Sequence, residues 1–138
     1  MKKLDQRGAA AFEFCIVAIA LFALVFAAFD LGRYVITVQS LRALANAGAR
    51  AMMVKCYNDA AIGKTISPST CTADYLTTAE KQAIAPYLYA GGLSPTMSTT
   101  VVGSALVVTA SLPGFTMIFS SIWGTSLNAP STSAKIPF

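Results

Sequence analysis

The sequence contains no histidine, and so lacks the commonest general base of enzymes and the commonest metal ligand. Its three cysteines do not have the spacing of a zinc site, since Cys56 and Cys71 form no C-x-x-C pair and Cys15 lies within an apolar run. The six acidic residues are scattered, and no glycine-rich stretch has the pattern of a phosphate-binding loop. We therefore predict that the protein is not an enzyme and has no metal site and no cofactor.

Charged residues are also scarce, at 12% of the chain, and the formal net charge is only +4. The N-terminal segment accounts for part of this charge, because Lys2, Lys3 and Arg7 are opposed there only by Asp5. The remainder of the chain has no clustered basic patch, which a nucleic-acid surface would need. We expect no nucleic-acid partner.

Proline is absent before Pro68, and Glu13 is the only charged residue between Ala9 and Phe29. About 20 apolar residues, rising 1.5 Å each in a helix, cross the ~30 Å hydrocarbon core of a bilayer. We predict a transmembrane helix over residues 9–29, and no second run of this kind follows it. A cleaved secretory signal is the competing interpretation, but its apolar region spans only about 7 to 15 residues and ends at a small-residue cleavage site.

The basic residues Lys2, Lys3 and Arg7 precede this helix. Short basic flanks stay on the cytoplasmic side of a membrane, so the chain after residue 29 is expected on the opposite side. The predicted organisation is a basic leader over residues 1–8, a membrane helix over residues 9–29, and one small exported domain over residues 30–138.

Glu13 is unusual because a carboxylate within a membrane helix costs a few kcal/mol and usually persists only where it has a partner or a task. The plainer alternative is that Glu13 lies near the cytoplasmic headgroups and is solvated. The spacing to Gly8 favours a task, since cleavage after Gly8 would make Glu13 the fifth residue of the mature chain.

In this arrangement the sequence resembles the type IV prepilin class, whose members carry a short basic leader ending in glycine, a glutamate at mature position five and a long apolar helix. Gly8, Glu13 and residues 14–29 match these features in turn. The resemblance implies that a prepilin-type peptidase cuts the bond between Gly8 and Ala9. It also implies that the Glu13 carboxylate pairs with the new Ala9 amine of a neighbouring subunit in a low-dielectric helix bundle.

Residues beyond the apolar run narrow this resemblance to the TadE-like minor pseudopilins of tight-adherence (Tad) pilus systems. The similarity extends from Arg7 to about Met53, with Gln6 in place of the first residue of a basic pair and Asp30 where the family often has glutamate. The residues that carry the motif are Arg7, Phe14, Gly32, Arg33, Tyr34, Gln39, Gly48, Ala49 and Arg50.

The resemblance implies a minor pseudopilin of the bacterial inner membrane that takes part in assembling an adhesive pilus by helix–helix packing. Its N-terminus would be cytoplasmic and its C-terminal domain periplasmic, with incorporation into the surface pilus as a further step. The implied partners are the prepilin-type peptidase, other pilins and pseudopilins, the inner-membrane pilus assembly platform and the lipid bilayer. The alternative is an uncleaved, membrane-anchored periplasmic scaffold or binding protein of a secretion system.

After the span, the helix is predicted to continue over residues 30–57 and to become amphipathic. Apolar or small residues recur there at steps of three and four and mark one stripe, which should carry the domain. The stripe comprises Leu31, Tyr34, Val35, Val38, Leu41, Ala45, Gly48 and Met52, whereas Arg33, Thr37, Ser40 and Asn46 are placed on other faces.

Turn-forming residues follow Tyr57, and Cys56 and Cys71 bracket the resulting loop, residues 56–71. In an exported domain these cysteines suggest a disulfide worth roughly 3 kcal/mol for a loop of this length, with free thiols as the alternative. Cys15 is interpreted as a packing or lipid-facing residue. A capping box at Thr77 and Glu80 predicts a short helix over residues 78–89 that stops near Ala85, with Ile84, Tyr87 and Leu88 facing inward.

The C-terminal part, residues 98–138, has the composition of strands. Residues 99–102 and 105–112 are rich in valine and threonine and are joined by Gly103 and Ser104, which predicts a hairpin. Residues 115–123 fit either a short helix or an edge strand, and residues 125–136 a last strand that Pro130 restricts to an edge or a bulge. The predicted fold is α+β and pilin-like, with a long N-terminal helix packed on a small antiparallel sheet.

Overall fold

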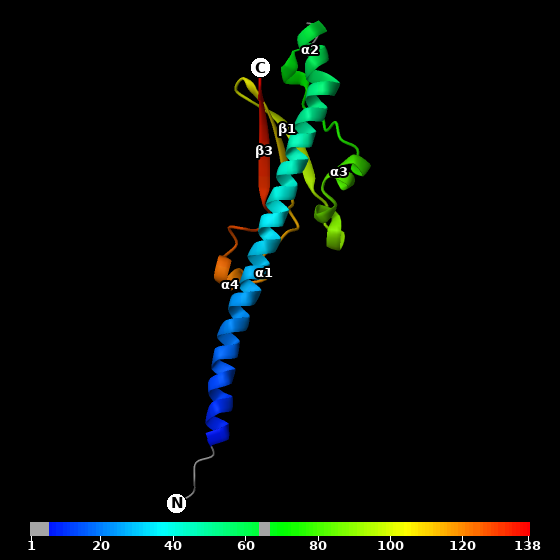
Figure 1. Ribbon diagram of the computed structural model, residues 1–138. Helices are drawn as coiled ribbons and strands as arrows, with labels where there is room; N and C mark the ends of the chain where they lie inside the picture. Colours follow the sequence, from blue (N-terminus) through cyan, green and yellow to red (C-terminus); the bar gives the residue numbers. More distant parts are fainter. Residues whose placement is uncertain (1–5, 64–66) are drawn as a thin grey trace, which may run out of the picture.

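The computed structural model describes residues 6–63 and 67–138, which form a long helix with a small α+β domain on one end (Figure 1). Helix α1 (Gln6–Met52) is 47 residues long. Its C-terminal half lies against an antiparallel sheet, while its N-terminal half projects away from the domain (Figure 1). The predicted α+β fold, with a long N-terminal helix packed on a small antiparallel sheet, is confirmed.

The helical path does not end at Tyr57 as predicted. A π-helical turn η1 (Met53–Tyr57) leads directly into α2 (Asn58–Gly63), and Asn58 itself has helical backbone angles. The turn-forming residues Asn58 and Asp59 are overruled here because Ala60 is buried and packs in a cluster with Met52 and Cys71. Tertiary packing of this kind routinely overrides local propensity.

The sheet has three antiparallel strands in the order β1-β2-β3. Strands β1 (Thr96–Val102) and β2 (Ala105–Ser111) form the predicted hairpin, with Thr99 opposite Val108. Strand β3 (Ser131–Pro137) pairs with the other side of β2. It begins just after Pro130, whose carbonyl accepts a hydrogen bond from the Leu112 amide, so the proline lies outside the ladder of an edge strand as expected.

The core lies between α1 and the sheet and consists of two clusters. One is centred on Leu41, Leu44 and Leu88, and the other on Met52, Leu106 and Val108. Met97 of β1 and Ala134 of β3 pack against both clusters, which joins them into one apolar layer. Exposed residues alternate along β3 with partly buried ones and the buried Ile136, so this strand presents one face to the helix.

Over residues 30–37, the face of α1 that packs on the domain differs from the predicted face. Leu31 and Val35 are exposed, and the buried positions there are Asp30 and Thr37. Thr37 tolerates burial because its hydroxyl donates to the Arg33 carbonyl at 2.8 Å, which satisfies its hydrogen. From Leu41 onward the predicted stripe is correct, since Leu41, Ala45, Gly48 and Met52 are buried.

Helix α3 (Thr78–Ile84) begins at the predicted capping box. The Glu80 carboxylate accepts from the Thr77 amide and hydroxyl, and these hydrogen bonds lower the pKa of Glu80. The helix stops at Ala85 as expected, and the 3-10 segment η3 (Pro86–Gly92) follows it. Only Leu88 of the three predicted inward residues is buried, whereas Ile84 and Tyr87 are 38% and 39% exposed.

The segment that the sequence left open, residues 115–123, is neither one helix nor a strand. It runs through turns along α1 and ends in the short helix α4 (Ser120–Trp123), which lies beside α1 at the end of the domain nearest the projecting half (Figure 1). Phe115 and Met117 are buried in the core and anchor this segment.

Cys56 and Cys71 form the predicted disulfide, with a sequence separation of 15. Cys71 is fully buried, so the bridge ties the loop after α2 to the π-helical turn η1, which contains Cys56, within the second core cluster. Residues 64–66 of this loop lie outside the described residues. Cys15 is a free, exposed thiol on the apolar half of α1.

Gly48 marks a close approach of α1 to the sheet, and we predict that a side chain there destabilises the domain. A Cβ atom at Gly48 would overlap Met97 Cε, the end of a flexible side chain, and would lie 3.2 Å from Cγ1 of the stiffer Val108. Gly48→Val should therefore lower the free energy of unfolding by about 1–3 kcal/mol through overpacking. The measurement is denaturant unfolding of the purified full-length protein in mild detergent.

Gly32→Val is the matched control, because a Cβ atom at Gly32 meets nothing within 4 Å. Valine and glycine differ by less than about 0.5 kcal/mol in helix propensity, so this variant should unfold close to the wild type. Equal loss of stability in both variants would show that the close contact at Gly48 is not the cause.

Candidate functional site: the N-terminal helix and the Asp30 junction

The N-terminal part of α1, residues 9–29, is called here the apolar half. It is long and apolar enough to cross a membrane, and none of its residues is buried in the domain. Large side chains are exposed all round it, including Phe14, Ile19 and Leu24. A helix that is apolar on every side needs a bilayer or other apolar helices around it.

Gly8, Ala9 and Glu13 lie in the first turns of α1, and all three are exposed. Within the part of the chain that the structure describes, the Glu13 carboxylate forms no ion pair. The leader residues Lys2, Lys3 and Asp5 lie outside the described residues. The predicted processing site is therefore placed on an accessible stretch of helix, and its cleavage stays a prediction.

Asp30 stands where the apolar half meets the domain, and it is the residue whose role the sequence did not reveal. Its carboxylate is 1% exposed. One oxygen accepts from the Ile118 amide at 3.2 Å and the other from the Phe119 amide at 3.0 Å. Arg33 Nη1 lies 3.2 Å from the first oxygen. A buried carboxylate with two amide donors and a guanidinium is well satisfied, so Asp30 fastens the loop before α4 to the helix.

Arg33 and Tyr34 complete the junction around Phe115. The Arg33 guanidinium lies over the Phe115 ring, 5.4 Å from its centroid, and the Tyr34 ring centroid is 6.4 Å from that of Phe115. The Arg33 side chain is 40% exposed, whereas Asp30 and Phe115 are buried. The ion pair with Asp30 therefore lies at the surface end of a buried network.

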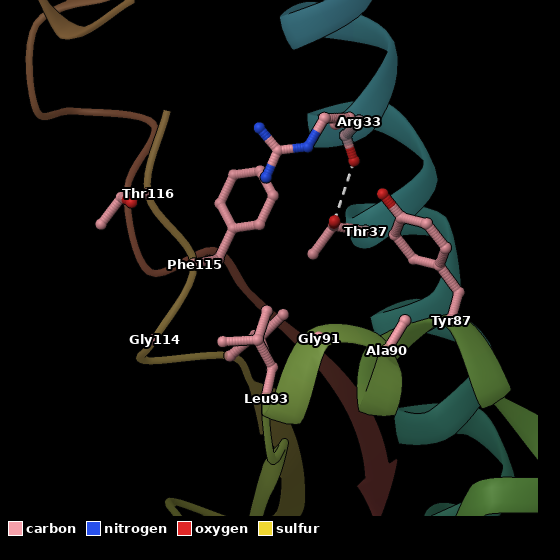
Figure 2. A pocket seen from close by; sticks show the side chains of 10 residues that line it. Arg33, Thr37, Tyr87, Ala90, Gly91, Leu93, Gly114, Phe115 and Thr116 are labelled. Carbon is pink, nitrogen blue, oxygen red and sulfur yellow. Dashed lines mark hydrogen bonds between the residues drawn. The ribbon is translucent and has the colours of Figure 1, made fainter. Parts of the chain in front are cut away.

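A cavity of about 390 Å³ opens beside this junction, and Figure 2 shows Arg33, Tyr87 and Leu93 around it. Arg33 supplies its only ionised group, and its remaining walls are apolar side chains, hydroxyls and the backbone of Gly91 and Gly114. It contains no pair of groups able to act as nucleophile and base. Within residues 6–63 and 67–138, no group of three potential metal ligands converges.

The motif residues of the predicted resemblance divide into two sets in the structure. Before residue 30 they are exposed on the apolar half, as Phe14 is. After residue 30 several of them hold the domain: Arg33 and Tyr34 pack on Phe115, and Gly48 and Ala49 are buried against the sheet. The motif residues Gln39 and Arg50 are exposed, Gly32 borders an apolar groove on the helix, and the Arg7 side chain lies outside the described residues.

The fold and this site define a class first: a small α+β domain carried by a helix whose other half is exposed and apolar enough to span a membrane. The family model described as TadE-like protein matches residues 8–50, which confirms the resemblance predicted from the sequence. The match covers the apolar half, Asp30 and the motif that follows, and residues 51–138 lie beyond it. No curated protein and no solved structure matches the chain.

We predict that Asp30→Ala detaches the loop before α4 from α1. The variant leaves the Ile118 and Phe119 amides, whose hydrogen bonds to Asp30 are partly buried, without that acceptor. Hydrogen–deuterium exchange on the full-length protein in detergent should show loss of protection at these two amides, with little change in β2.

Arg33→Gln serves as the comparison, because it removes the partly exposed ion pair and keeps the Asp30 carboxylate. Such a pair contributes at most about 1 kcal/mol, so both amides should stay protected. Unchanged exchange at Ile118 and Phe119 in Asp30→Ala would refute the anchoring role of the carboxylate.

Proposed function

We propose that this protein is a minor pseudopilin that takes part in the assembly of a Tad-type adhesive pilus. The observation that carries the proposal is the joint one: residues 8–50 match the TadE-like model, and the matched helix leaves its apolar half bare outside the domain. In this mechanism the bare half is held first by the bilayer and then by the helices of other pilins and pseudopilins.

The helix can pass from the bilayer to a bundle of pilin helices because the side chains of its apolar half suit both environments. Its side chains are exposed phenylalanines, leucines and isoleucines with small alanines between them, which pack equally against acyl chains and against neighbouring helices. The domain need not unfold for this transfer, since its core packs against residues 34–60 and not against the apolar half.

Glu13 supplies the interaction that sets how neighbouring subunits align in this assembly. Cleavage between Gly8 and Ala9 by a prepilin-type peptidase creates a cationic amine four residues before the glutamate. In a helix bundle an unpaired carboxylate is costly, so pairing of Glu13 with the Ala9 amine of a neighbour favours one axial register between subunits. Glu13 and Ala9 are both exposed in the single chain, and Glu13 forms no ion pair with any residue that the structure describes. Both positions are therefore accessible to a neighbouring subunit.

The proposed location follows from the basic leader and the apolar half together. The N-terminus lies in the cytoplasm, one helix crosses the inner membrane, and the domain lies in the periplasm, where a disulfide such as Cys56–Cys71 is stable. There the subunit meets the assembly platform and the other pilins before it enters the pilus.

The first experiment determines the N-terminal residue of the protein extracted from membranes of its native host. Intact mass or terminal sequencing should give a start at Ala9. Gly8→Leu, which blocks access of a glycine-specific peptidase to the bond, should leave the leader in place. A start at Met1 in the unaltered protein would instead favour an uncleaved anchored scaffold.

The second experiment tests the charge on Glu13. Glu13→Gln removes the carboxylate at nearly constant shape and should reduce pilus yield severely, while the protein still enters the membrane. Glu13→Asp keeps the charge and should retain more assembly. The readouts are pili sheared from cells and membrane-fraction immunoblots, and normal piliation with Glu13→Gln would remove the charge-pairing argument.

A further inference from the structure

The domain has an apolar rim on the side that faces the apolar half of α1. This rim, called here the collar, consists of Ile118, Phe119 and Ile122. Ile118 and Ile122 are 66% and 54% exposed, although both belong to a segment anchored in the core. Exposed large apolar residues that cluster in this way mark a surface that contacts something apolar.

Two contacts fix the height of the collar along the helix. The Phe119 ring stacks on Phe26 with the centroids 6.2 Å apart, and Phe26 in turn stacks on Phe22 at 6.3 Å. The Asp30 carboxylate, one helical turn after Phe26, accepts hydrogen bonds from the Ile118 and Phe119 amides. Phe26 lies about 4.5 Å inside the end of the apolar half at 1.5 Å per residue, so the collar overlaps the last turn of that half.

Charge also distinguishes this part of the domain. The chain has no Asp, Glu, Lys or Arg from Gln82 to Ala134, a stretch that contains the whole collar. At the same level, the buried Asp30 carboxylate is neutralised by an ion pair with Arg33, whose side chain is 40% exposed. Ser120 and Ser121 supply the exposed polar groups of α4, which suit the headgroup layer.

The geometry points to a lipid bilayer as the occupant of the collar. We propose that Ile118, Phe119 and Ile122 insert into the outer boundary of the membrane that the apolar half crosses, so that the domain docks on the bilayer surface. The inference rests on the membrane anchoring in the proposed function. A helix whose Phe26 lies in acyl chains places the stacked Phe119 at the same depth, within the roughly 5–10 Å reached by interfacial elements.

A second copy of the protein is a weaker occupant. The collar contacts the apolar half at Phe26, which stacks on Phe119 and is itself 52% exposed. Any group that covers Ile118 and Ile122 must therefore also cover the end of a membrane helix. Lipid does this without a dedicated complementary surface.

The test uses intrinsic fluorescence, since Trp123 is the only tryptophan of the chain. In a Trp123→Phe background, Ile122→Trp places a probe on the collar of the full-length protein. The protein is reconstituted in phosphatidylcholine–phosphatidylglycerol vesicles. Emission is then compared with lipids brominated near the headgroup end or near the terminal methyl of the acyl chain, and with aqueous iodide.

Two matched probes bracket the collar in the same background. Phe22→Trp reports on the apolar half, and Ile62→Trp reports on the opposite end of the molecule, where Ile62 is 82% exposed. Ile122→Trp should lose emission most with lipid brominated near the headgroups and little with iodide. Phe22→Trp should respond to the deeper bromines, and Ile62→Trp to iodide alone.

The outcomes separate the two claims. Lipid quenching of Phe22→Trp together with quenching of Ile122→Trp by iodide alone would overturn the collar and leave the membrane helix intact. Absence of lipid quenching at Phe22→Trp would overturn both. Resistance of Ile122→Trp to lipid and iodide alike would show that protein covers the collar, against the proposal. Ile118→Trp gives the same readout should Ile122→Trp not fold.

Discussion

The buried carboxylate of Asp30 is the interaction on which the rest of this structure depends. It lies at the point where α1 passes from a bare apolar helix into a domain support, and it binds two amides that come from residues almost ninety positions later in the chain. A carboxylate has few ways to be buried without loss, so these donors fix both the rotation and the height of the domain on the helix. A turn of α1 by a single residue would swing the carboxylate by about 100° and leave it unsatisfied.

Two further contacts along the same helical path, beyond Asp30, fix the domain to it. In the middle, Gly48 and Ala49 bring the sheet close to the backbone of α1. At the far end, the Cys56–Cys71 disulfide ties the returning loop to the helix. The domain is therefore held along its whole length, while the apolar half carries none of its core. This separation of roles explains how one continuous helix can serve a compact domain and still offer a bare surface for membrane and assembly.

The same arrangement gives the TadE-like motif a physical meaning in this chain. Its first part, through Phe14, is exposed on the apolar half, and in its second part Arg33, Tyr34, Gly48 and Ala49 pack against the domain. The two parts meet at Asp30. A motif that spans this junction specifies the helix surface on one side and the position of the domain on the other.

The sequence by itself determined the elements whose signals are local. The apolar run, the capping box at Thr77 and Glu80, the Gly103–Ser104 hairpin and the paired cysteines all act over a few residues or through composition, and each lies where it was expected. The similarity to the TadE-like family could also be read from residues 8–50, because it depends on residue types at fixed spacing within one helix.

Tertiary structure alone decided which residues of that helix are buried near its midpoint. Periodicity counts apolar side chains, and so it chose Leu31 and Val35 and placed Thr37 on another face. The chain instead buries Asp30 and Thr37, because backbone amides and carbonyls supply the hydrogen bonds that make a polar group tolerable in a core. For Asp30 those partners come from a distant loop, and for α2 the burial of Ala60 beside Cys71 overrules Asn58 and Asp59. Contacts between residues far apart in the chain leave no periodic trace in the sequence, and only the folded structure brings them together.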